Sequence, residues 1–421
     1  MNIQDLAGKK VVLIGYGKEG QATESFLKKQ LPEVDLTIRD ASQGEQYLDG
    51  QRNFDLAIKS PGIPKELIKI PYITATQIFF STVPKTQIIG VTGTKGKSTT
   101  TSLIHHILMQ AGHDARLVGN IGNPMLEELA KPYDEKTIFV CELSSYQLQE
   151  LEQSPHIGVI VSLFPDHINY HGSLESYYAS KKCLIQNMNR DDIYIYNPKF
   201  SLLSDWEADT QATSIPYEQI KQFPQMPLLG EHNKDNVRAA ITVAHQYGIS
   251  DDLIHQAIAT FKPLPHRLEL VGTYREITFY DDAISTTPES TIAALKAIPN
   301  VKTIMLGGQD RGYIFEEFVE YLKTTQIESM IFFPDSGARI RTLVEETFDH
   351  LPAMLSTDNM KDAVAFAYEH TPAGGVCLLS TASPSYSIWK NFEDKGAQFQ
   401  EYVKHYAQQD PQNTATRKEE V

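Results

Sequence analysis

The 421-residue sequence predicts an α/β protein of three domains. Three observations point to this class. Short apolar runs that end in glycine or polar residues recur along the chain, as expected of buried strands. Two of these runs enter glycine-rich turns that precede a helical pattern. The length allows two to four domains at roughly 100–200 residues each.

The composition is that of a soluble globular protein, with 41% hydrophobic and 22% charged residues. No apolar run approaches the ~20 residues of a membrane span. The N-terminus lacks the apolar core of a signal peptide, so we expect a cytoplasmic protein. A net charge of −15 argues against a nucleic-acid surface. The cysteines lack metal-ligand spacing and are expected to be reduced: Cys141, Cys183 and Cys377.

Residues 1–86 predict a small α/β domain. A buried strand enters Gly15-Tyr16-Gly17-Lys18-Glu19-Gly20, a GxGxxG pattern, and a helix follows to about residue 30. Asp40, about 20 residues further on, suits a ribose contact, so a dinucleotide is one interpretation. The domain is short for a complete NAD domain, and we favour a nucleotide or UDP-type diphosphate. The expected strands are 11–14, 35–38 and 55–58, the last ending at Ser60-Pro61-Gly62.

Residues 87–263 open on the most informative stretch. A strand over 88–91 stops at Gly93-Thr94-Lys95-Gly96, and Lys97, Ser98, Thr99 and a helix follow. Glycines let backbone N–H groups converge on phosphate oxygens, and the helix N-terminus and a lysine add positive charge. The hydroxyl of Ser98 is placed to bind Mg²⁺. The strict motif has one more glycine, where this chain has Val91, so the match is the shorter GxxGKS.

Later strands of the same domain end in polar residues. A strand over 137–141 delivers Glu142, a natural Mg²⁺ ligand or water holder, although an acid at a helix N-terminus is the simpler alternative. A strand over 159–163 leads to Asp166 and His167, which could bind metal or phosphate. A helix carries Lys181 and Lys182, one of which we expect to face solvent. Another helix opens with His232, Asn233 and Asn236. Asparagines at a helix N-terminus can contact a ligand, but helix capping accounts for their presence almost as well.

A proline-punctuated junction at 262–267 marks the last boundary, which gives domains at 1–86, 87–263 and 264–421. Four apolar strands beyond it end in polar or glycine turns and predict a binding edge. We expect the tail from about residue 408 to be disordered. The four strands are 277–280, 303–306, 330–333 and 376–379.

Several stretches together resemble the Mur ligase family over about residues 1–405: GVTGTKGKSTT, GNIGNP, CELSSYQL, FPDHINYHGS, YYASKK, GEHNKDNVRAA, LPHRLE, LGGQDR and SIWKNFEDKG. The resemblance implies a Rossmann-like N-terminal domain for a UDP substrate, a central phosphate-loop ATPase domain, and a Rossmann-like C-terminal domain for the amino acid and ATP. It implies a cytoplasmic, monomeric ligase that uses ATP and Mg²⁺ and acts on small molecules. That ligase would add glutamate, with D-glutamate favoured, to UDP-N-acetylmuramoyl-L-alanine through an acyl phosphate, in peptidoglycan synthesis.

Functional residues carry over from the family by position. Lys97, Glu142, His167 and Lys181 form the catalytic set, and Lys181 matches a lysine that these ligases carbamylate, which could hold a second Mg²⁺. The metal ligands are Ser98, Glu142, His167 and carbamylated Lys181. The ATP contacts are Gly93, Thr94, Lys95, Gly96, Lys97, Ser98, Thr99, Asn233, Asn236, Arg267 and Asp282, with His232 nearby. The UDP-substrate contacts are Gly15, Gly17, Lys18, Asp40, Ser60, Pro61, Gly62 and Asn120. The glutamate contacts are Thr286, Arg311, Ser385 and Phe392.

One departure from the family affects the amino acid. The family's D-glutamate-adding members usually read Asn-Asp-Ser-Lys-Ala-Thr where this chain has 281–286, so Ile284 replaces a lysine. The lost cation should weaken anion binding unless Arg311 compensates, which leaves L-glutamate as an alternative. A folate polyglutamate synthase-type ligase is less compatible, because that class lacks the GxGxxG domain. A nicotinamide-dependent oxidoreductase built on residues 1–86 and an inactive regulatory homologue are the remaining alternatives.

Overall fold

The computed structural model describes residues 3–220 and 223–408. It confirms the α/β class and contains three sheets. The chain forms two compact units, Met1–Pro227 with His232–Phe261, and Leu228–Glu231 with Lys262–Val421. Among the described residues, we find no helix whose length and apolar character would let it cross a bilayer. The tail expected to be disordered falls outside the described residues, except for its first residue, which ends helix α15 (Phe392–Gln408).

The first sheet is parallel, in the order β2-β1-β3-β4. It confirms the three strands predicted before residue 60 and adds a two-residue edge strand. Its strands are β1 (Lys10–Ile14), β2 (Asp35–Arg39), β3 (Leu56–Lys59) and β4 (Tyr72–Ile73), and its helices are α1 (Lys18–Gln30) and α2 (Ala75–Thr82). Short 3-10 helices lie at Ile3–Leu6, Ala41–Gln43, Glu45–Leu48, Gln51–Asn53, Lys65–Leu67 and Lys85–Gln87.

The second sheet is also parallel, in the order β10-β9-β8-β5-β7-β6. Its strands are β5 (Ile88–Thr92), β6 (Ala115–Gly119), β7 (Ile138–Glu142), β8 (Ile157–Ile160), β9 (Ile193–Tyr196) and β10 (Thr213–Pro216). Because β5 pairs with both β7 and β8, the segments that leave these three strands emerge side by side at one edge. The strand predicted over 159–163 was placed too late, because Ser162 leaves the sheet to bind the loop after β5.

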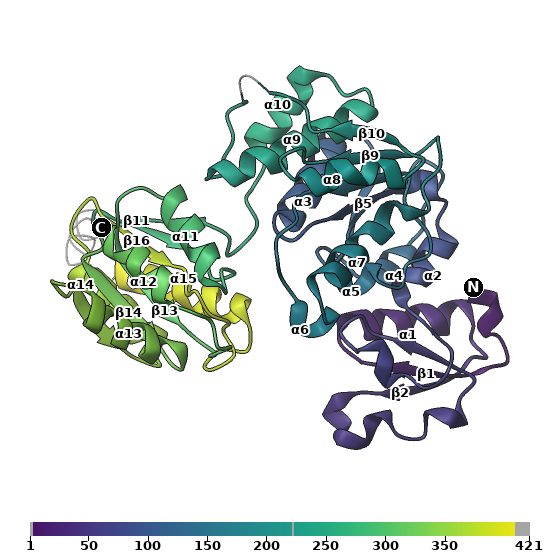
Figure 1. Ribbon diagram of the computed structural model, residues 1–421, viewed down its shortest axis with the longest axis horizontal. Coiled ribbons are helices and arrows are strands. Elements are labelled where there is room, and N and C mark those ends of the chain that lie inside the picture. Colours follow the sequence, from purple (N-terminus) through teal and green to yellow (C-terminus); the bar gives the residue numbers. More distant parts are fainter. Residues whose placement is uncertain (1–2, 221–222, 409–421) are drawn as a thin grey trace, which may run out of the picture. The chain divides into compact units, whose positions relative to one another are not determined.

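Helices cover this second sheet (Figure 1). They are α3 (Lys97–Gln110), α4 (Met125–Leu129), α5 (Ser145–Leu148), α6 (Ile168–His171), α7 (Leu174–Gln186), α8 (Ser201–Asp205), α9 (Glu231–Gln246) and α10 (Asp251–Thr260), with a 3-10 helix at Trp206–Asp209.

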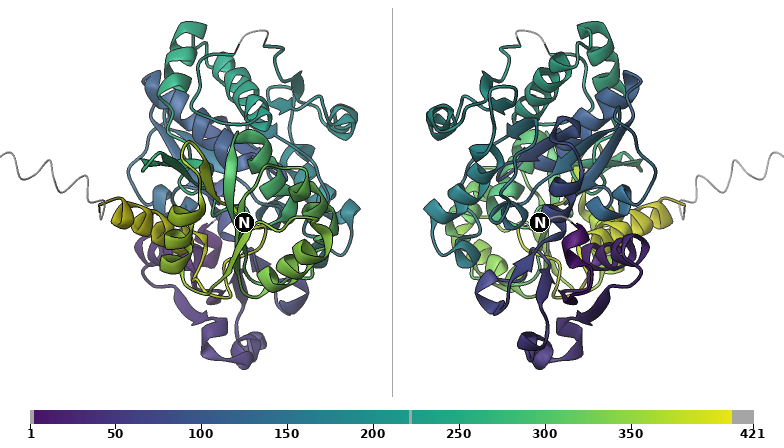
Figure 2. Two further views of the ribbon diagram at one scale, coloured as in Figure 1. Left: turned by 90° about the vertical axis from the view of Figure 1, so that its left-hand side faces the viewer. Right: turned by 90° about the vertical axis from the view of Figure 1, so that its right-hand side faces the viewer.

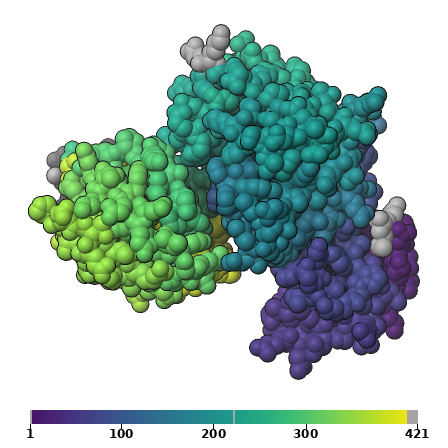
Figure 3. Space-filling view, in the orientation of Figure 1, coloured from purple at the N-terminus to yellow at the C-terminus, as the bar shows by residue number. Residues whose placement is uncertain are grey.

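The first two sheets share one hydrophobic core. Phe26 and Phe79 belong to the same buried cluster as Phe139 of β7. A buried ion pair joins Lys59 Nζ to Glu150 Oε1 at 3.1 Å, across the two sheets. The space-filling view shows the purple and blue residues of this unit in direct contact (Figure 3). The boundary predicted at 86–87 therefore falls between two sheets that pack as one unit.

The second unit is built on a mixed sheet in the order β11-β12-β16-β13-β14-β15, with β11 antiparallel. Its strands are β11 (Glu269–Tyr274), β12 (Ile277–Asp281), β13 (Val301–Gly307), β14 (Ser329–Phe333), β15 (Ala353–Ser356) and β16 (Val376–Leu379). Its helices are α11 (Pro288–Ala297), α12 (Glu316–Lys323), α13 (Ser336–Thr347), α14 (Met360–His370) and α15. Helices α14 and α15 pack on one face and α12 and α13 on the other (Figure 2).

Candidate active site

The loop after β5 has the backbone of a phosphate cradle. Gly93 and Gly96 have φ angles of 153° and 86°, a region that favours glycine. A Cβ at Gly96 would lie 2.3 Å from Asn236 Oδ1, so only glycine lets helix α9 come this close. The loop is tied to the chain after β8, because the N–H groups of Thr94 and Lys95 donate to the carbonyl and hydroxyl of Ser162, both at 2.9 Å. The cradle is therefore packed against helix α9 and hydrogen-bonded to the chain after β8.

Lys97 is the first residue of α3 and lies over this loop. Its Nζ donates to the carbonyl oxygens of Gly93 and Thr94, each at 3.1 Å. Ser98 and Thr99 follow in the first helical turn. The ammonium group, the loop N–H groups and the helix N-terminus converge on one place, which is the arrangement that binds phosphate.

Two asparagines of α9 are buried against the cradle helix. Asn236 Oδ1 accepts a hydrogen bond from Thr100 Oγ1 at 3.2 Å, and Asn236 Nδ2 donates to Asn233 Oδ1 at 2.8 Å. His232, one residue earlier, is exposed. The structure thus places the two asparagines expected at ATP beside the phosphate cradle.

Glu142 ends β7 with its side chain fully buried. Its Oε1 accepts from Asn120 Nδ2 at 3.0 Å, whereas Oε2 is buried and has no hydrogen-bond partner among the described residues. Burying a carboxylate oxygen without a partner is costly, and a cation would satisfy it. The pair therefore fits a divalent metal ion. Asn120, expected at the UDP substrate, lies here rather than at the ends of β1 to β3.

His167 stands before α6 with a φ of 51°. Its ring Nδ1 lies 3.0 Å from Tyr146 Oη, and its backbone N–H donates to Asp166 Oδ1 at 2.9 Å. Burial lowers the pKa of His167, Asp166 opposes this shift, and the nearby charges of Lys97 and Lys181 reinforce it. A neutral imidazole beside a phosphate cradle can act as a metal ligand.

Lys181 lies on α7 and is 1% exposed. Its Nζ donates to Gly93 O at 2.9 Å and lies 4.8 Å from the centre of the Tyr177 ring. Burial, followed by the charge of Lys97, lowers its pKa well below that of a free lysine. Lys182 instead reaches the more exposed Asp209 at 2.6 Å, as the expected outward-facing lysine of the pair would.

The ends of β1, β2 and β3 meet around Gly15. Its N–H donates to Arg39 O at 2.8 Å, and its carbonyl accepts from Ser60 Oγ at 3.1 Å. The Tyr16 N–H donates to Asp40 Oδ2 at 2.7 Å. Hydrogen bonds from Ser42 and the Tyr16 N–H lower the pKa of Asp40. These strand ends gather the remaining residues expected at the UDP substrate: Gly15, Gly17, Lys18, Asp40, Ser60, Pro61 and Gly62.

In the second unit, Asp282 lies at the carboxyl edge of the sheet. Its Oδ2 accepts from Ser380 Oγ at 2.8 Å and its Oδ1 from the Leu268 N–H at 3.2 Å. Burial raises the pKa of Asp282 to about 6, opposed by hydrogen bonds from Ser285 and Ser380 and by the charge of Arg267. The structure thus brings together Arg267 and Asp282, both expected at ATP.

The loops that carry the expected glutamate contacts are joined to one another. The Gly307 N–H donates to Thr381 O at 2.8 Å, and the Gln309 N–H donates to Pro384 O at 2.7 Å. The Ser385 hydroxyl is buried and has no hydrogen-bond partner among the described residues, so it could accept a ligand. The expected contacts lie on or beside these loops, at Thr286, Arg311, Ser385 and Phe392, of which Arg311 is exposed.

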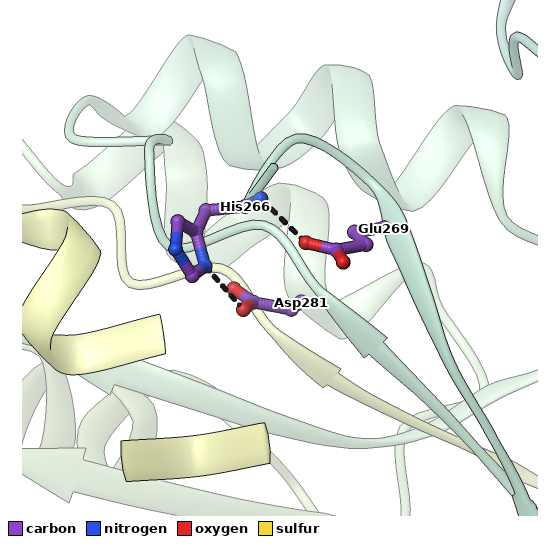
Figure 4. A group of neighbouring side chains, drawn as sticks. All are labelled: His266, Glu269 and Asp281. Atoms are coloured by element: carbon purple, nitrogen blue, oxygen red, sulfur yellow. Dashed lines mark hydrogen bonds and ion pairs between the residues drawn. The ribbon is translucent and has the colours of Figure 1, made fainter. Parts of the chain in front are cut away.

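Figure 4 shows a cluster at the base of this edge, formed by His266, Glu269 and Asp281. His266 Nδ1 lies 2.7 Å from Asp281 Oδ2, and the backbone N–H of His266 donates to Glu269 Oε2 at 2.8 Å. Gln400 Nε2 of α15 donates to both carboxylates at 3.0 Å. These are hydrogen-bond distances, and the bond to Asp281 raises the pKa of His266. We therefore assign the cluster to holding α15 on the sheet, not to metal binding.

Lys395 of α15 is fully buried. Its Nζ donates to Thr381 Oγ1 at 2.5 Å and lies 5.9 Å from the centre of the Trp389 ring. Burial lowers the pKa of Lys395 to about 7, and the charges of Asp281 and Asp282 oppose that shift. The lysine thus links the helix to the loop that carries Ser385.

We expect the difference in unfolding free energy between the wild type and Lys395→Met to depend on pH. An unfolded lysine has a pKa of about 10.4, so between pH 7 and 10 the unfolded chain holds a proton that the folded chain lacks. The stability contributed by this group is fully present above about pH 10 and is lost progressively as the pH falls to about 7, by up to about 1.4 kcal/mol per pH unit. Urea titrations of both proteins at pH 7.5 and 9.5 measure the effect, and an unchanged difference would contradict a lowered pKa.

Three residues around the site were not predicted from the sequence. Ser162 fixes the phosphate loop, Tyr177 donates to Thr94 Oγ1 at 3.1 Å, and Tyr146 contacts His167. A serine inside the otherwise apolar run 159–163 was a usable signal for Ser162. The tyrosines gave no such signal, because aromatic residues on helices usually belong to the core.

Comparisons with known proteins identify relatives of this chain. Residues 91–217 match the family model of the Mur ligase middle domain, and residues 266–383 match that of the Mur ligase, glutamate ligase domain. The UDP-N-acetylmuramoylalanine--D-glutamate ligase of Streptococcus sanguinis is 32% identical over 94% of this chain and 97% of its own length. The same-named protein of Streptococcus mutans is 32% identical over the same shares.

Solved structures share the fold. The UDP-N-acetylmuramate-alanine ligase of Thermotoga maritima aligns with a TM-score of 0.65 and 16% identity, covering 96% of this chain and 100% of that one. The MurF ligase of the same organism, solved in complex with ADP, gives a TM-score of 0.61 and 15% identity, covering 96% and 97%.

Proposed function

Because this chain belongs to the Mur ligase family, we propose that it joins D-glutamate to UDP-N-acetylmuramoyl-L-alanine with hydrolysis of ATP to ADP and phosphate. It is an ATP-dependent ligase of peptidoglycan synthesis. Within the proposal, it acts in the cytoplasm as a monomer on small-molecule substrates. The proposed substrates are those for which the two streptococcal relatives, matched over nearly the whole chain, are named.

The observation that carries the proposal is the convergence of four side chains on one phosphate cradle. Lys97 and Lys181 both donate to Gly93 O, and their charges act on His167. The charge of Glu142 acts on Lys181. Two basic groups, a carboxylate and an imidazole at one loop suit ATP and a metal ion together.

Mg²⁺ would be held by Ser98, Glu142, His167 and carbamylated Lys181. The buried Oε2 of Glu142 supports this assignment, because it has no hydrogen-bond partner among the described residues. When bound, the ion would neutralise the charge that builds up on the phosphoryl oxygens.

The surroundings of Lys181 support the proposal that it is carbamylated. A neutral amine can add CO₂ to give a carbamate and a proton, and the lowered pKa of Lys181 favours the neutral amine. The product is an anion where the structure has a buried lysine next to Lys97. It would balance the charge of Lys97 and offer oxygen atoms to a metal ion.

The proposed reaction has two steps. The acceptor carboxylate attacks the γ-phosphorus of ATP, ADP leaves, and an acyl phosphate forms. The amine of glutamate then attacks the acyl carbon and loses a proton, and phosphate leaves. Lys97 and the N–H groups of the cradle stabilise the transferring phosphoryl group. The glutamate would be held by Thr286, Arg311, Ser385 and Phe392. The UDP group would be held by the strand ends around Gly15.

Phosphate release with Mg-ATP and UDP-N-acetylmuramoyl-L-alanine tests the proposal, with D- and L-glutamate assayed in parallel. We expect release with D-glutamate. Release with L-glutamate alone would preserve the ATP chemistry and the acceptor but overturn the stereochemistry. Silence with both amino acids would overturn the proposed substrates.

L-Glutamate is the second candidate because of Ile284. Its N–H donates to His266 O at 3.2 Å, so it lies in the loop after β12, near the expected glutamate contacts. An isoleucine here supplies no charge for a carboxylate. Arg311 is exposed and its Nε donates to Gln309 Oε1 at 3.2 Å, which supports it as the replacement cation.

A further inference from the structure

Tyr146 links the segment after Glu142 to His167. It lies on α5, whose N-terminus is capped by Ser144 directly after β7. Its ring packs against the rings of His167, Tyr170 and His171. The Tyr170 ring lies edge-on at 4.4 Å, and the His171 ring stacks at 5.6 Å with an angle of 21°. Its hydroxyl is 3.0 Å from His167 Nδ1. The hydroxyl is thus directed at one nitrogen of this imidazole.

The two nitrogens of His167 face different partners. Nδ1 faces Tyr146, whereas Nε2 lies 3.8 Å from Asp166 Oδ2. The same carboxylate oxygen is 3.7 Å from Lys95 Nζ, in the phosphate loop. At 3.8 Å, Nε2 is beyond hydrogen-bond distance of this carboxylate, whereas Nδ1 is within it of the Tyr146 hydroxyl.

A neutral imidazole carries its proton on only one nitrogen, and only the other nitrogen can bind a metal ion. If Nδ1–H donates to the Tyr146 oxygen, Nε2 keeps a free lone pair. If Tyr146 instead donates to Nδ1, Nε2 holds the proton and cannot bind. The bond made by one ring nitrogen commonly sets the role of the other in metal sites.

We propose that Tyr146 is a positioning residue that accepts the Nδ1–H of His167 and so leaves Nε2 available to the metal ion. The proposal rests on the proposed function in one respect, namely that His167 is a metal ligand. In this role Tyr146 acts only through His167. Its phenol fixes both the ring orientation and the tautomer.

The test replaces only the hydroxyl, as Tyr146→Phe in the full chain. We expect Mn²⁺, titrated in the presence of ADP and followed by electron paramagnetic resonance, to bind about tenfold more weakly, the lower end of the usual effect of losing such a partner. Tyr178→Phe is the matched control, because Tyr178 also lies in this aromatic group, tilted against Tyr177 at 5.7 Å. It should bind Mn²⁺ as the wild type does.

A second measurement reads the tautomer without a metal ion. Nitrogen NMR of histidine-labelled protein at pH 8.5 should show His167 protonated on Nδ1, and this signal should be absent from His167→Gln. In Tyr146→Phe we expect a mixture of tautomers. A wild-type His167 protonated on Nε2 would overturn the proposal even if Tyr146→Phe failed to fold. Unchanged Mn²⁺ affinity in Tyr146→Phe would also overturn it.

The assignment of His167 as a metal ligand and the role of Tyr146 can be overturned separately. If His167→Gln binds Mn²⁺ as tightly as the wild type, His167 is not a ligand, and the metal assignment in the proposed function fails. If His167→Gln weakens Mn²⁺ binding and Tyr146→Phe does not, the assignment stands and the role of Tyr146 fails.

Discussion

Replacing Lys97 with alanine is expected to lower ATP-dependent phosphate release by about 10³-fold or more. Its ammonium lies over the phosphate loop, 3.1 Å from two loop carbonyl oxygens, at the N-terminus of α3. Removing a single preorganised donor to a transition state typically costs about 10²–10³ in rate. Lys97 supplies a full charge as well. Single-turnover phosphate release at saturating Mg-ATP measures this loss.

Lys95→Ala is the matched control, because Lys95 lies in the same loop with its side chain 58% exposed and 3.7 Å from Asp166. We expect it to lose less than about tenfold, as surface ion pairs contribute little. The circular dichroism melting curve of Lys97→Ala serves as the folding control and should stay near that of the wild type. Near-normal turnover by folded Lys97→Ala would refute the phosphate-loop assignment.

The second large effect is expected at Lys181. Its replacement by alanine should lower the rate of ligation by about 10²-fold or more. The change removes a buried amine that donates to Gly93 O and, in the proposed function, the carbamate that would hold a metal ion. Lys182→Ala, one residue later and facing Asp209, should retain activity within about twofold. Ligase assays with and without bicarbonate compare the two variants.

Carbon NMR in ¹³C-bicarbonate separates a carbamate from a purely structural lysine. The wild type and Lys182→Ala should show a carbamate signal that Lys181→Ala lacks. Full activity of Lys181→Ala without any added anion would refute its catalytic role. An equal signal in all three proteins would place the carbamate elsewhere.

The sequence predicted the interior of each sheet better than its edges. Strands such as β5 and β16 are buried along their whole length and appear as continuous apolar runs. Edge strands β11 and β15 have alternately or partly exposed residues and were not predicted. Four of the six strands in the second unit were found, because only central strands are buried on both faces.

Chemistry that depends on one turn was predictable, whereas contacts between distant segments were not. The phosphate loop, Glu142 and His167 each follow a strand in the sequence. The approach of Asn236 to Gly96 and that of Tyr146 to His167 depend on packing between elements, which hydrophobic periodicity does not encode. The charged surroundings of Lys395 were hidden for the same reason, since it follows the end of β12 by more than a hundred residues.

The bond between Thr100 and Asn236 has a consequence for how the protein is made. The two residues are 136 positions apart. At about 5–20 residues per second, a ribosome needs roughly 7–27 s to travel that distance. During this interval the nascent chain has its cradle glycines but not the helix that packs against them. We therefore expect nascent chains stalled before α9 to bind nucleotide poorly, and full retention by them would show that the loop is stable without α9.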